Sequence, residues 1–542
     1  MEAYEDLRGA IESAALVRKK DGVRIIHSEQ SGISDPWIFD FRALMLRPRW
    51  INRYAEIFWE KYADKLPFQV GGLETAGIPL VAAIVMKSVE RGTPINGFYI
   101  RKSRKRQGLM KYIEGTLTNE PVIFVDDLIN SGQSANKQID VLADAGIKVT
   151  DVFTLLAFRN DAVYAFFKDK GVVLSHMFTL PDFNIPLVTT PSAETPGDAY
   201  EVLWRYRGPD PSLNIVVQKS APVLDEERVF FGCDDSKFRA LSQSTGEVVW
   251  EFEIGKHPPG KAILSTPITY GENAYFGAYD GNVYALNRRT GNKVWVYSEA
   301  DWIGSSPDIA PELGLIYIGL EFGLLKKQGG IAALDIMSGK EMWRAGHLGT
   351  THGSPLYIKA ENLVVIGSND GILYAYDAKT GGLRWQFASD GEIKTRPAYD
   401  KMHREIVFGA MSGRLYALFA ADGSPRHAQE IGVAMYSIPL VHDNAIYVAS
   451  LDKRVIALDS ATWKTLWTYE TNGRIFASPV IHEGSLWIGS NSGILRELDP
   501  KGGALKSSFQ ASERIVNAVA FSGKTIFVPT VANEIYCLKK KD

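Results

Sequence analysis

Cysteine is almost absent from this chain, which has two in 542 residues. Cys233 and Cys537 lie far apart in sequence, and so small a number argues against a disulfide scaffold and against a zinc site built from cysteines. An excess of one charge is also missing, because the formal net charge is −3 at pH 7. We therefore expect no nucleic-acid partner. The length exceeds one ordinary hydrophobic core and predicts two or more domains.

Long hydrophobic runs are missing as well. The longest apolar helix candidate, Ile78 to Met86, ends at Lys87, which is far short of the roughly 20 apolar residues that cross a membrane. The first residues, Met1 to Asp6, are acidic and lack the apolar core of a secretory signal. The sequence therefore predicts a cytoplasmic protein that does not enter a membrane.

The most informative segment is residues 122–134. Val122 to Val125 are typical of a buried strand in a parallel sheet, and Asp126 and Asp127 stand where that strand is expected to end. A polar loop follows, and Ser134 is placed to cap the next helix. Loop N–H groups and a helix N-terminus attract phosphate, while the acidic pair suits ribose hydroxyls or hydrated Mg²⁺. Many α/β proteins have aspartate at a strand end, so the segment alone leaves both interpretations open.

The surrounding residues predict alternating strands and helices. Strands are expected at 25–26, 37–39, 68–70, 95–100, 122–126 and 149–157, and helices at 4–20, 49–63, 78–90 and 135–145. This order is typical of βαβ units and of a parallel sheet, in which ligands bind at the carboxyl ends of the strands.

Three motifs resemble those of the type I phosphoribosyltransferases, and of orotate phosphoribosyltransferase in particular. Residues 122–134 resemble the family's signature for phosphoribosyl diphosphate (PRPP). Arg101 to Gly108 looks like the mobile loop of the orotate enzymes, and Gly72 to Pro79 resembles the pyrophosphate loop. The resemblance covers roughly residues 20–165, with the motifs in the family's order. It implies an α/β phosphoribosyltransferase domain over residues 1–180, a homodimer, and Mg²⁺ bound together with PRPP.

The resemblance also implies a role for each matching residue. Asp126, Asp127 and Lys105 would be catalytic, and Asp127 would contact the metal through water. Asn130, Ser131, Gly132, Gln133 and Ser134 would hold the 5′-phosphate; Glu74, Thr75, Ala76, Arg101, Lys102 and Gln107 would hold pyrophosphate; Arg159 and Gln30 would bind the base. A guanidinium can clamp a carboxylate through two hydrogen bonds, so Arg159 implies a small anionic acceptor.

Two positions depart from the family's pattern. Gln30 stands where the family has a lysine, and Gln107 stands where its mobile loop has a histidine. An amide donates hydrogen bonds but neither offsets a charge nor acts as a titrating acid. One alternative is therefore a sensor that binds PRPP or a nucleotide without turnover, and another is an adaptor that only dimerises. An enzyme needs Lys105 and the acidic pair for turnover, a sensor needs them only for binding, and an adaptor needs neither.

A different pattern begins near residue 200. Four prolines between 181 and 198 and the lack of a helical period predict a linker over residues 181–200. Prolines then recur at intervals of 40 to 48 residues, at Pro222, Pro267, Pro307, Pro355, Pro397, Pro439 and Pro479. Each unit predicts four short strands, and in most units the fourth carries a tryptophan that we expect to pack between units. Four strands in about 40–50 residues is the period of a β-propeller.

The number of units predicts how the ring closes. Residues 516–538 supply only three strands of an eighth unit, and Val202 to Tyr206 has the pattern of the missing fourth. We therefore predict an all-β, eight-bladed propeller over residues 201–542, closed by this N-terminal strand so that no edge remains free.

The unit at 280–295 resembles the pyrroloquinoline quinone (PQQ) type of propeller repeat. Quinoprotein dehydrogenases of that type pair adjacent cysteines near the quinone, and this chain has no such pair, so PQQ is not expected. The propeller is predicted to be a scaffold or a platform for a protein partner whose identity the sequence does not give. Residues 320–330 are an insertion that is either a contact site or a longer hairpin.

Overall fold

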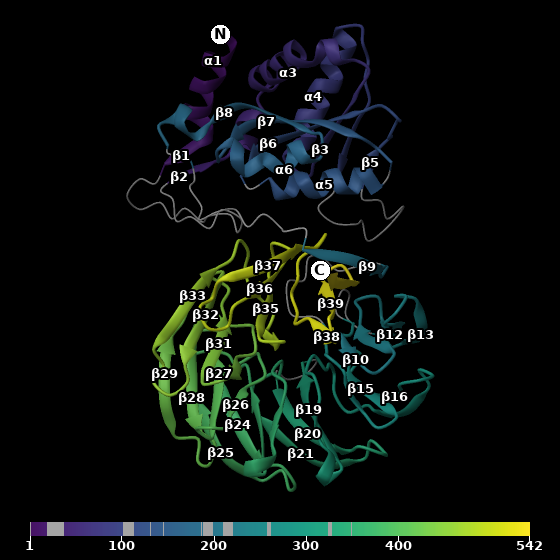
Figure 1. Ribbon diagram of the computed structural model, residues 1–542, viewed down its shortest axis with the longest axis vertical. Coiled ribbons are helices and arrows are strands. Elements are labelled where there is room, and N and C mark those ends of the chain that lie inside the picture. Colours follow the sequence, from purple (N-terminus) through teal and green to yellow (C-terminus); the bar gives the residue numbers. More distant parts are fainter. Residues whose placement is uncertain are drawn as a thin grey trace. The chain divides into compact units, whose positions relative to one another are not determined.

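The computed structural model describes residues 2–18, 37–100, 113–130, 132–144, 146–185, 187, 199–209, 220–256, 262–323, 328–347 and 349–541. The chain forms two compact units, Met1–Thr195 and Pro196–Asp542. The first contains helices and a sheet, and the second is built of strands (Figure 1). None of the described helices is long and apolar enough to cross a membrane.

The described strands of the first unit include a six-stranded sheet in the order β5-β4-β3-β6-β7-β8. Its strands are β3 (Gln69–Leu73), β4 (Gly97–Ile100), β5 (Ile113–Gly115), β6 (Val122–Ile129), β7 (Val149–Ala157) and β8 (Val173–Thr179), and a separate pair is formed by β1 (Leu16–Arg18) and β2 (Trp37–Phe39). Within the large sheet only β5 runs antiparallel to its neighbour. The predicted α/β fold with a mainly parallel sheet is confirmed.

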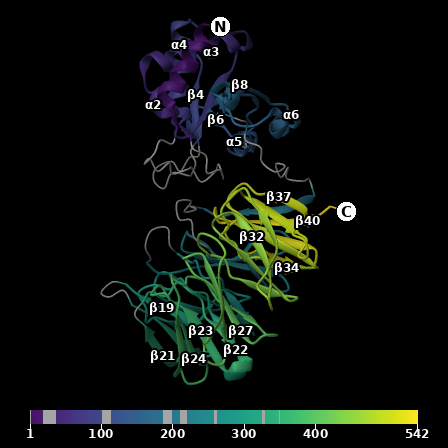
Figure 2. The same ribbon diagram turned by 90° about the vertical axis from the view of Figure 1, so that its left-hand side faces the viewer.

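Helices cover both faces of this sheet (Figure 2). The helices are α1 (Glu2–Ala10), the π-helix η1 (Ile11–Ala15), α2 (Phe41–Met45), α3 (Pro48–Tyr62), η2 (Ala63–Lys65), α4 (Gly77–Glu90), α5 (Gln133–Asp144), η3 (Asp161–Tyr164), α6 (Ala165–Asp169) and η4 (Leu180–Phe183). In β6, Ile123 and Val125 belong to the core that contains α3 and α4, whereas Val122 and Phe124 belong to the core that contains α5. A strand buried on both faces explains why its sequence is a continuous apolar run.

Several boundaries of the first unit differ from the sequence predictions. Strand β6 does not end at Asp126, because β7 continues beside it and pairs Asp126 with Thr154; the acidic pair therefore lies inside the strand. Helix α5 begins at Gln133, so Ser134 lies in its first turn and is not its N-cap.

The helix predicted at 4–20 is also shorter than expected, because η1 leads directly into β1. The compact fold continues into the range predicted as a linker. Leu180 and Phe183 are buried in the core, and Ile185 is buried beside them.

The strands of the second unit follow one another in groups of four. Blade 1 is β10 (Val223–Leu224), β11 (Arg228–Gly232), β12 (Lys237–Ser242) and β13 (Val248–Glu253); blade 2 is β14 (Ile268–Tyr270), β15 (Asn273–Gly277), β16 (Val283–Asn287) and β17 (Lys293–Tyr297); blade 3 is β18 (Asp308–Ala310), β19 (Leu315–Phe322), β20 (Gln328–Asp335) and β21 (Glu341–His347). Blade 4 is β22 (Leu356–Ile358), β23 (Leu363–Gly367), β24 (Ile372–Asp377) and β25 (Leu383–Ala388); blade 5 is β26 (Ala398–Asp400), β27 (Glu405–Gly409), β28 (Arg414–Phe419) and β29 (Pro425–Glu430). Blade 6 is β30 (Leu440–His442), β31 (Ala445–Ala449), β32 (Arg454–Asp459) and β33 (Thr465–Glu470); blade 7 is β34 (Val480–His482), β35 (Ser485–Gly489), β36 (Ile494–Leu498) and β37 (Leu505–Gln510).

The eighth blade confirms the predicted closure. It consists of β38 (Ala520–Ser522), β39 (Thr525–Thr530), β40 (Glu534–Lys540) and, as its outermost strand, β9 (Tyr200–Arg207). Strand β9 pairs antiparallel with β40, with Trp204 opposite Cys537, and Figure 1 shows it beside the last strands of the chain. The described strands thus make an eight-bladed ring joined by strands from both ends of the propeller sequence.

One contact recurs between neighbouring blades. On β17, the Trp295 ring lies over Gly339 in a turn of blade 3, where a Cβ would come within 2.5 Å of it, and its Nε1–H donates to the Ile336 carbonyl at 3.0 Å. A glycine is required because its φ is +69° and the indole covers it. The same arrangement joins Trp204 to Gly246, Trp250 to Gly291, Trp343 to Gly381, Trp385 to Gly423 and Trp467 to Gly503.

Two interfaces between blades lack this contact. Between blades 5 and 6, His427 takes the place of the tryptophan and stacks on Trp463, which takes the place of the glycine, with ring centroids 4.9 Å apart. Between blades 7 and 8, the buried Glu497 accepts hydrogen bonds from Ser485, Tyr200 and Lys540 at 2.9, 3.1 and 2.7 Å. Blades 7 and 8 are therefore joined here by a polar contact.

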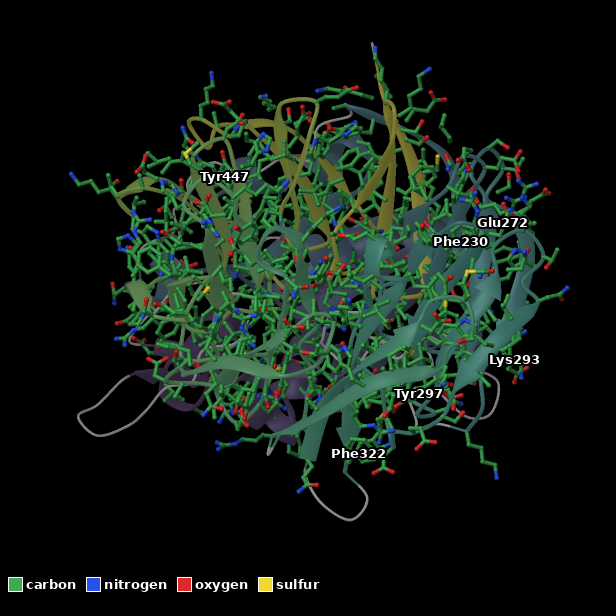
Figure 3. All side chains as sticks on the ribbon, turned by 90° about the horizontal axis from the view of Figure 1, so that it is seen from below. Phe230, Glu272, Lys293, Tyr297, Phe322 and Tyr447 are labelled. Carbon is green, nitrogen blue, oxygen red and sulfur yellow. The ribbon has the colours of Figure 1, made fainter. Side chains whose placement is uncertain are left out.

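The insertion in blade 3 lengthens a hairpin. Strands β19 and β20 pair along their whole length, up to Phe322 opposite Gln328, and Phe322 lies at the edge of the propeller (Figure 3). Of the two interpretations of residues 320–330, the described residues support the longer hairpin. The two cysteines, Cys233 and Cys537, are buried free thiols of the propeller, and burial raises the pKa of Cys537 to about 12.

Candidate functional site

The predicted site lies where the direction of the chain through the sheet reverses. Strand β3 is followed by α4 and β4 on one side, and β6 is followed by α5 and β7 on the other. Strands β3 and β6 are parallel neighbours, with Gly72 opposite Val125. The connections after these two strands therefore leave the sheet toward opposite sides, and open α/β sheets bind ligands at such a point, outside the carboxyl ends of the strands.

The segment after β3 turns tightly into α4. A Cβ on Gly77 would lie 2.9 Å from the Gly72 Cα and 3.3 Å from the Val125 carbonyl, so only glycine permits this approach of helix to strand. Between Gly72 and Gly77, the side chain of Glu74 is half-buried and that of Thr75 is exposed. The peptide bond that joins Glu74 to Thr75 is cis. The Glu74 N–H donates to the Ile100 carbonyl at 2.9 Å. The predicted pyrophosphate loop therefore lies beside the end of β4, from which the predicted mobile loop continues.

The acidic pair is held by backbone N–H groups. Asp126 Oδ1 accepts a hydrogen bond from the Asp127 N–H at 3.0 Å, and Asp127 Oδ1 accepts one from the Leu128 N–H at 2.8 Å. Burial raises the pKa of Asp127, and the hydrogen bond from Leu128 opposes that rise only in part. Burial, and next the charge of Asp126, raise the pKa of the fully buried Tyr54. A carboxylate with a raised pKa is a better proton acceptor and is well suited to ribose hydroxyls.

The loop after β6 packs against the segment that follows β7. Gly132 is buried with a φ of +77°, and a Cβ there would come within 2.8 Å of the Phe166 ring. The Gly132 carbonyl accepts a hydrogen bond from the Asn136 N–H at 2.9 Å, and this bond starts α5. The loop N–H groups therefore lead directly into a helix N-terminus, as in many phosphate sites.

Arg159 lies next to this loop. It is buried, and its Nε–H donates to Asn130 Oδ1 at 2.8 Å. The Arg159 N–H donates to the Tyr164 hydroxyl at 3.2 Å, and that hydroxyl lies 3.1 Å from the Ile129 carbonyl and 2.9 Å from the Asn130 carbonyl. Burial lowers the pKa of Arg159 and raises that of Tyr164 to about 12. The predicted base-binding arginine is thus attached to the predicted phosphate loop.

The structure brings together the described members of the predicted site. Glu74, Thr75, Ala76, Asp126, Asp127, Asn130, Gly132, Ser134 and Arg159 all lie at the carboxyl edge of the sheet or in the loops that leave it. Outside the described residues lie the strand predicted at 25–26, Gln30, Arg101, Lys102, Lys105, Gln107, Ser131 and the side chain of Gln133. Sequence reasoning missed Tyr164, because nothing in Ala162 to Phe167 separates a bridging tyrosine from a core aromatic.

The acidic pair is the candidate contact for a metal ion. Among the described residues, no group of three or more histidine, cysteine, aspartate or glutamate side chains is arranged to hold a metal ion. Mg²⁺ usually keeps several waters and takes one or two carboxylates together with substrate phosphates. Asp126 and Asp127 fit that mode of binding, which needs PRPP to complete it.

The fold defines a class of protein: an α/β domain with a candidate site at the carboxyl edge of its sheet, followed by an eight-bladed propeller. The N-terminal region is 33% identical to orotate phosphoribosyltransferase of Bradyrhizobium sp. (strain ORS 278) over 141 residues, which are 25% of this chain and 76% of that protein. It is also 33% identical, over 158 residues, to the same enzyme of Bradyrhizobium sp. (strain BTAi1 / ATCC BAA-1182), covering 28% of this chain and 85% of that protein.

The propeller has relatives of its own. The family model described as outer membrane protein assembly factor BamB matches residues 192–321, 327–407 and 402–518. The crystal structure of BamB from Moraxella catarrhalis superimposes with a TM-score of 0.51 at 18% identity, covering 63% of this chain and 98% of that one, which shows the propeller fold alone. The chain therefore belongs to the orotate phosphoribosyltransferase family through its N-terminal region and to the BamB family through its propeller.

Proposed function

We propose that the first unit is a Mg²⁺-dependent phosphoribosyltransferase that transfers ribose 5-phosphate from PRPP to a nitrogen of a small anionic base such as orotate. The observation that carries the proposal is that two loops and an acidic pair belong to adjacent strands at one sheet edge. The Glu74 loop follows β3, Asp126 and Asp127 lie in the last half of β6, and the loop at Asn130 follows β6. Their chemistry suits a pyrophosphate, a ribose and a 5′-phosphate, which are the three parts of PRPP.

In the proposed reaction the bond between ribose C1 and the pyrophosphate oxygen breaks, and a bond from C1 to the base nitrogen forms. The proton of that nitrogen is released to pyrophosphate or to solvent. Pyrophosphate leaves with the bonding electron pair, and positive charge develops on the ribose. Asp126 and Asp127 hold the ribose hydroxyls and offer negative charge near that centre. Loop N–H groups at the start of α5 hold the 5′-phosphate, and Lys105 with Arg101 and Lys102 receives the departing pyrophosphate. Mg²⁺ bound with PRPP would neutralise pyrophosphate charge and lie near Asp127 through water.

Arg159 is the proposed acceptor residue. Its guanidinium is charged at neutral pH, and its backbone N–H and Nε–H are both fixed by neighbours. A fixed guanidinium selects a planar carboxylate geometrically. We further propose that the unit acts as a homodimer in the cytoplasm, and that the propeller is a scaffold for a protein partner.

The second candidate is a sensor that binds PRPP or a nucleotide without turnover. Gln30 and Gln107 favour it, because each replaces a residue of the family's pattern that carries or transfers charge. Both functions use the same PRPP site, so they differ in turnover and not in binding.

Pyrophosphate release tests the proposal. The full chain is incubated with PRPP and Mg²⁺, with and without orotate and a panel of bases, in parallel with Lys105→Ala. Release that requires an acceptor and falls sharply in Lys105→Ala supports the transferase. PRPP binding by calorimetry without release under any acceptor supports the sensor. Neither binding nor release contradicts both.

A further inference from the structure

We propose that Asn130, Arg159 and Tyr164 form one unit that couples the 5′-phosphate loop to the acceptor site, so that the two ligands bind cooperatively. Asn130 follows β6, Arg159 follows β7, and Tyr164 lies at the end of η3. The two strands are parallel neighbours at this point: Ile129 pairs with Ala157, and the Phe158 N–H donates to the Ile129 carbonyl at 3.0 Å. The inference rests on the proposed function and adds how its two binding sites communicate.

The link between the sites is the hydrogen bond from Arg159 Nε–H to Asn130 Oδ1 at 2.8 Å. Asn130 belongs to the predicted phosphate loop, and Arg159 is the predicted acceptor residue. With Nε bound to Asn130, an acceptor carboxylate is recognised through the two terminal nitrogens of the guanidinium. The direction of these nitrogens then depends on the position of Asn130, because a guanidinium is a rigid plane.

Burial makes this dependence strong. Arg159 is 7% exposed. A buried donor that loses its hydrogen-bond partner is left desolvated and unpaired, which costs free energy. The orientation of Arg159 therefore depends on the position of Asn130, because a broken Nε–H bond would leave a polar group buried without a partner. In an exposed arginine, water could replace Asn130 as the acceptor for the Nε–H, and the position of Asn130 would then not affect the guanidinium.

Tyr164 fixes the backbone on both sides of the link. Its hydroxyl accepts a hydrogen bond from the Arg159 N–H and shares its proton between the carbonyls of Ile129 and Asn130. One side chain thus holds the strand end before the phosphate loop and the residue after β7. Phe166, two residues later, packs against the position where Gly132 lacks a Cβ.

The consequence is a coupling free energy between two ligands. A 5′-phosphate bound beside Asn130 fixes its position, and Asn130 then holds Arg159 in the orientation that an acceptor carboxylate needs. By linkage, the acceptor must improve phosphate binding by the same factor. Couplings of this kind amount to about 5- to 150-fold in affinity, and we expect the lower part of that range, because one side-chain hydrogen bond carries the link.

Calorimetry on the full chain tests this inference. Ribose 5-phosphate is the phosphate probe, because it lacks pyrophosphate and cannot react, and orotate is the acceptor probe. In the wild type, saturating ribose 5-phosphate is expected to tighten orotate binding about fivefold or more. In Asn130→Ala the factor is expected to fall to near one while ribose 5-phosphate still binds through loop N–H groups.

The controls separate this inference from the proposed function. Asn52→Ala removes an asparagine of α3 that donates to Glu56 Oε1 at 2.8 Å on the surface, and it should leave the factor unchanged. Tyr164→Phe should reduce the factor without abolishing ribose 5-phosphate binding. Three results would overturn the coupling and leave the proposed function standing. The wild type could bind the two probes independently, the wild type could bind ribose 5-phosphate alone, or Asn130→Ala could keep the wild-type factor. A wild type that binds neither ribose 5-phosphate nor PRPP overturns the proposed function as well.

Discussion

In the propeller one contact is repeated from blade to blade, whereas in the α/β unit the polar contacts at the sheet edge occur once each. Six tryptophan–glycine contacts hold successive blades, and they explain why the second half of the sequence is periodic. The first unit has no such period, and its unusual residues gather at the carboxyl ends of β3, β6 and β7. The repeated residues of the propeller therefore maintain the fold. The polar residues at the sheet edge of the first unit do not repeat, and we assign these to chemistry.

The largest effect is expected from a residue of the candidate site. Asp127→Asn keeps the size of the side chain but removes its charge, and we expect pyrophosphate release to fall by about 10²–10³-fold, as when a single electrostatic contributor is removed from an active site. The thermal unfolding of the propeller should not change.

Asp64→Asn is the matched control, because Asp64 is exposed on η2, and it should retain full activity. Equal activity in the Asp127 and Asp64 variants would contradict the role given to the acidic pair.

The second prediction concerns a repeated contact. Trp295→Ala removes a buried indole and its hydrogen bond to Ile336, and it should lower the free energy of unfolding of the propeller by about 3–5 kcal/mol, as large-to-small core substitutions do. Calorimetric unfolding of the full chain measures the loss. Val294→Ala on the same strand is the control, since Val294 is 48% exposed, and should cost much less. Equal losses of unfolding free energy in the two variants would show that the tryptophan contact does not hold the blades together.

The third prediction addresses the polar contact of Glu497 between blades 7 and 8. Burial raises the pKa of Glu497, but hydrogen bonds from Lys540, Ser507 and Ser485 outweigh it and the pKa lies below its usual value. A carboxyl whose folded-state pKa is lowered stabilises the fold above its unfolded pKa of about 4.3 and loses that contribution as the pH falls through the folded value. Glu497→Gln should cost about 2 kcal/mol at neutral pH, the range for hydrogen bonds to charged groups.

The measurement is the unfolding temperature of the propeller as a function of pH. The variant should lose less stability than the wild type as the solution is acidified below about pH 4.3. Glu272→Gln is the control, because Glu272 is exposed and pairs with the exposed Arg289 at 3.4 Å. Figure 3 shows Glu272 at the periphery of the propeller. Parallel curves of unfolding temperature against pH for the wild type and Glu497→Gln would show that the charge of Glu497 does not stabilise the contact between blades 7 and 8.

The smallest expected effect comes from the inverted contact between blades 5 and 6. Trp463→Gly alone leaves a gap over His427, and His427→Trp alone crowds Trp463, so each should destabilise the propeller. The double variant recreates the regular contact, and we expect it to be more stable than the sum of the two by about 1–2 kcal/mol, within the range for touching residues. Additive effects in chemical denaturation would show that the two rings do not interact.

Much of the fold is predictable from sequence, and the reason differs between the two units. The eight blades and their closure follow from a period and from one missing strand, because each blade repeats a local pattern. In the first unit the run Val122 to Val125 predicts a buried strand, but the extension of β6 to Ile129 depends on pairing with β7. Its acidic residues are therefore placed by a neighbour that the local sequence does not show.

The candidate site is predictable in its parts and not in its connections. Asp126, Asp127 and Asn130 are recognisable because charge and small polar residues follow an apolar run. The bond from Arg159 to Asn130 and the bridging by Tyr164 join residues 29 and 34 positions apart. Such contacts depend on which strands are neighbours and on how their loops pack, and no motif encodes them.

The central claim is that the first unit carries out phosphoribosyl transfer within a chain whose second unit is a propeller. The most direct measurement is the mass-spectrometric yield of nucleotide from PRPP, Mg²⁺ and orotate with the full chain, followed in time beside pyrophosphate release. The account predicts that nucleotide and pyrophosphate form in equal amounts and that both are lost in Asp127→Asn. Pyrophosphate and nucleotide both absent, with PRPP bound, would contradict it.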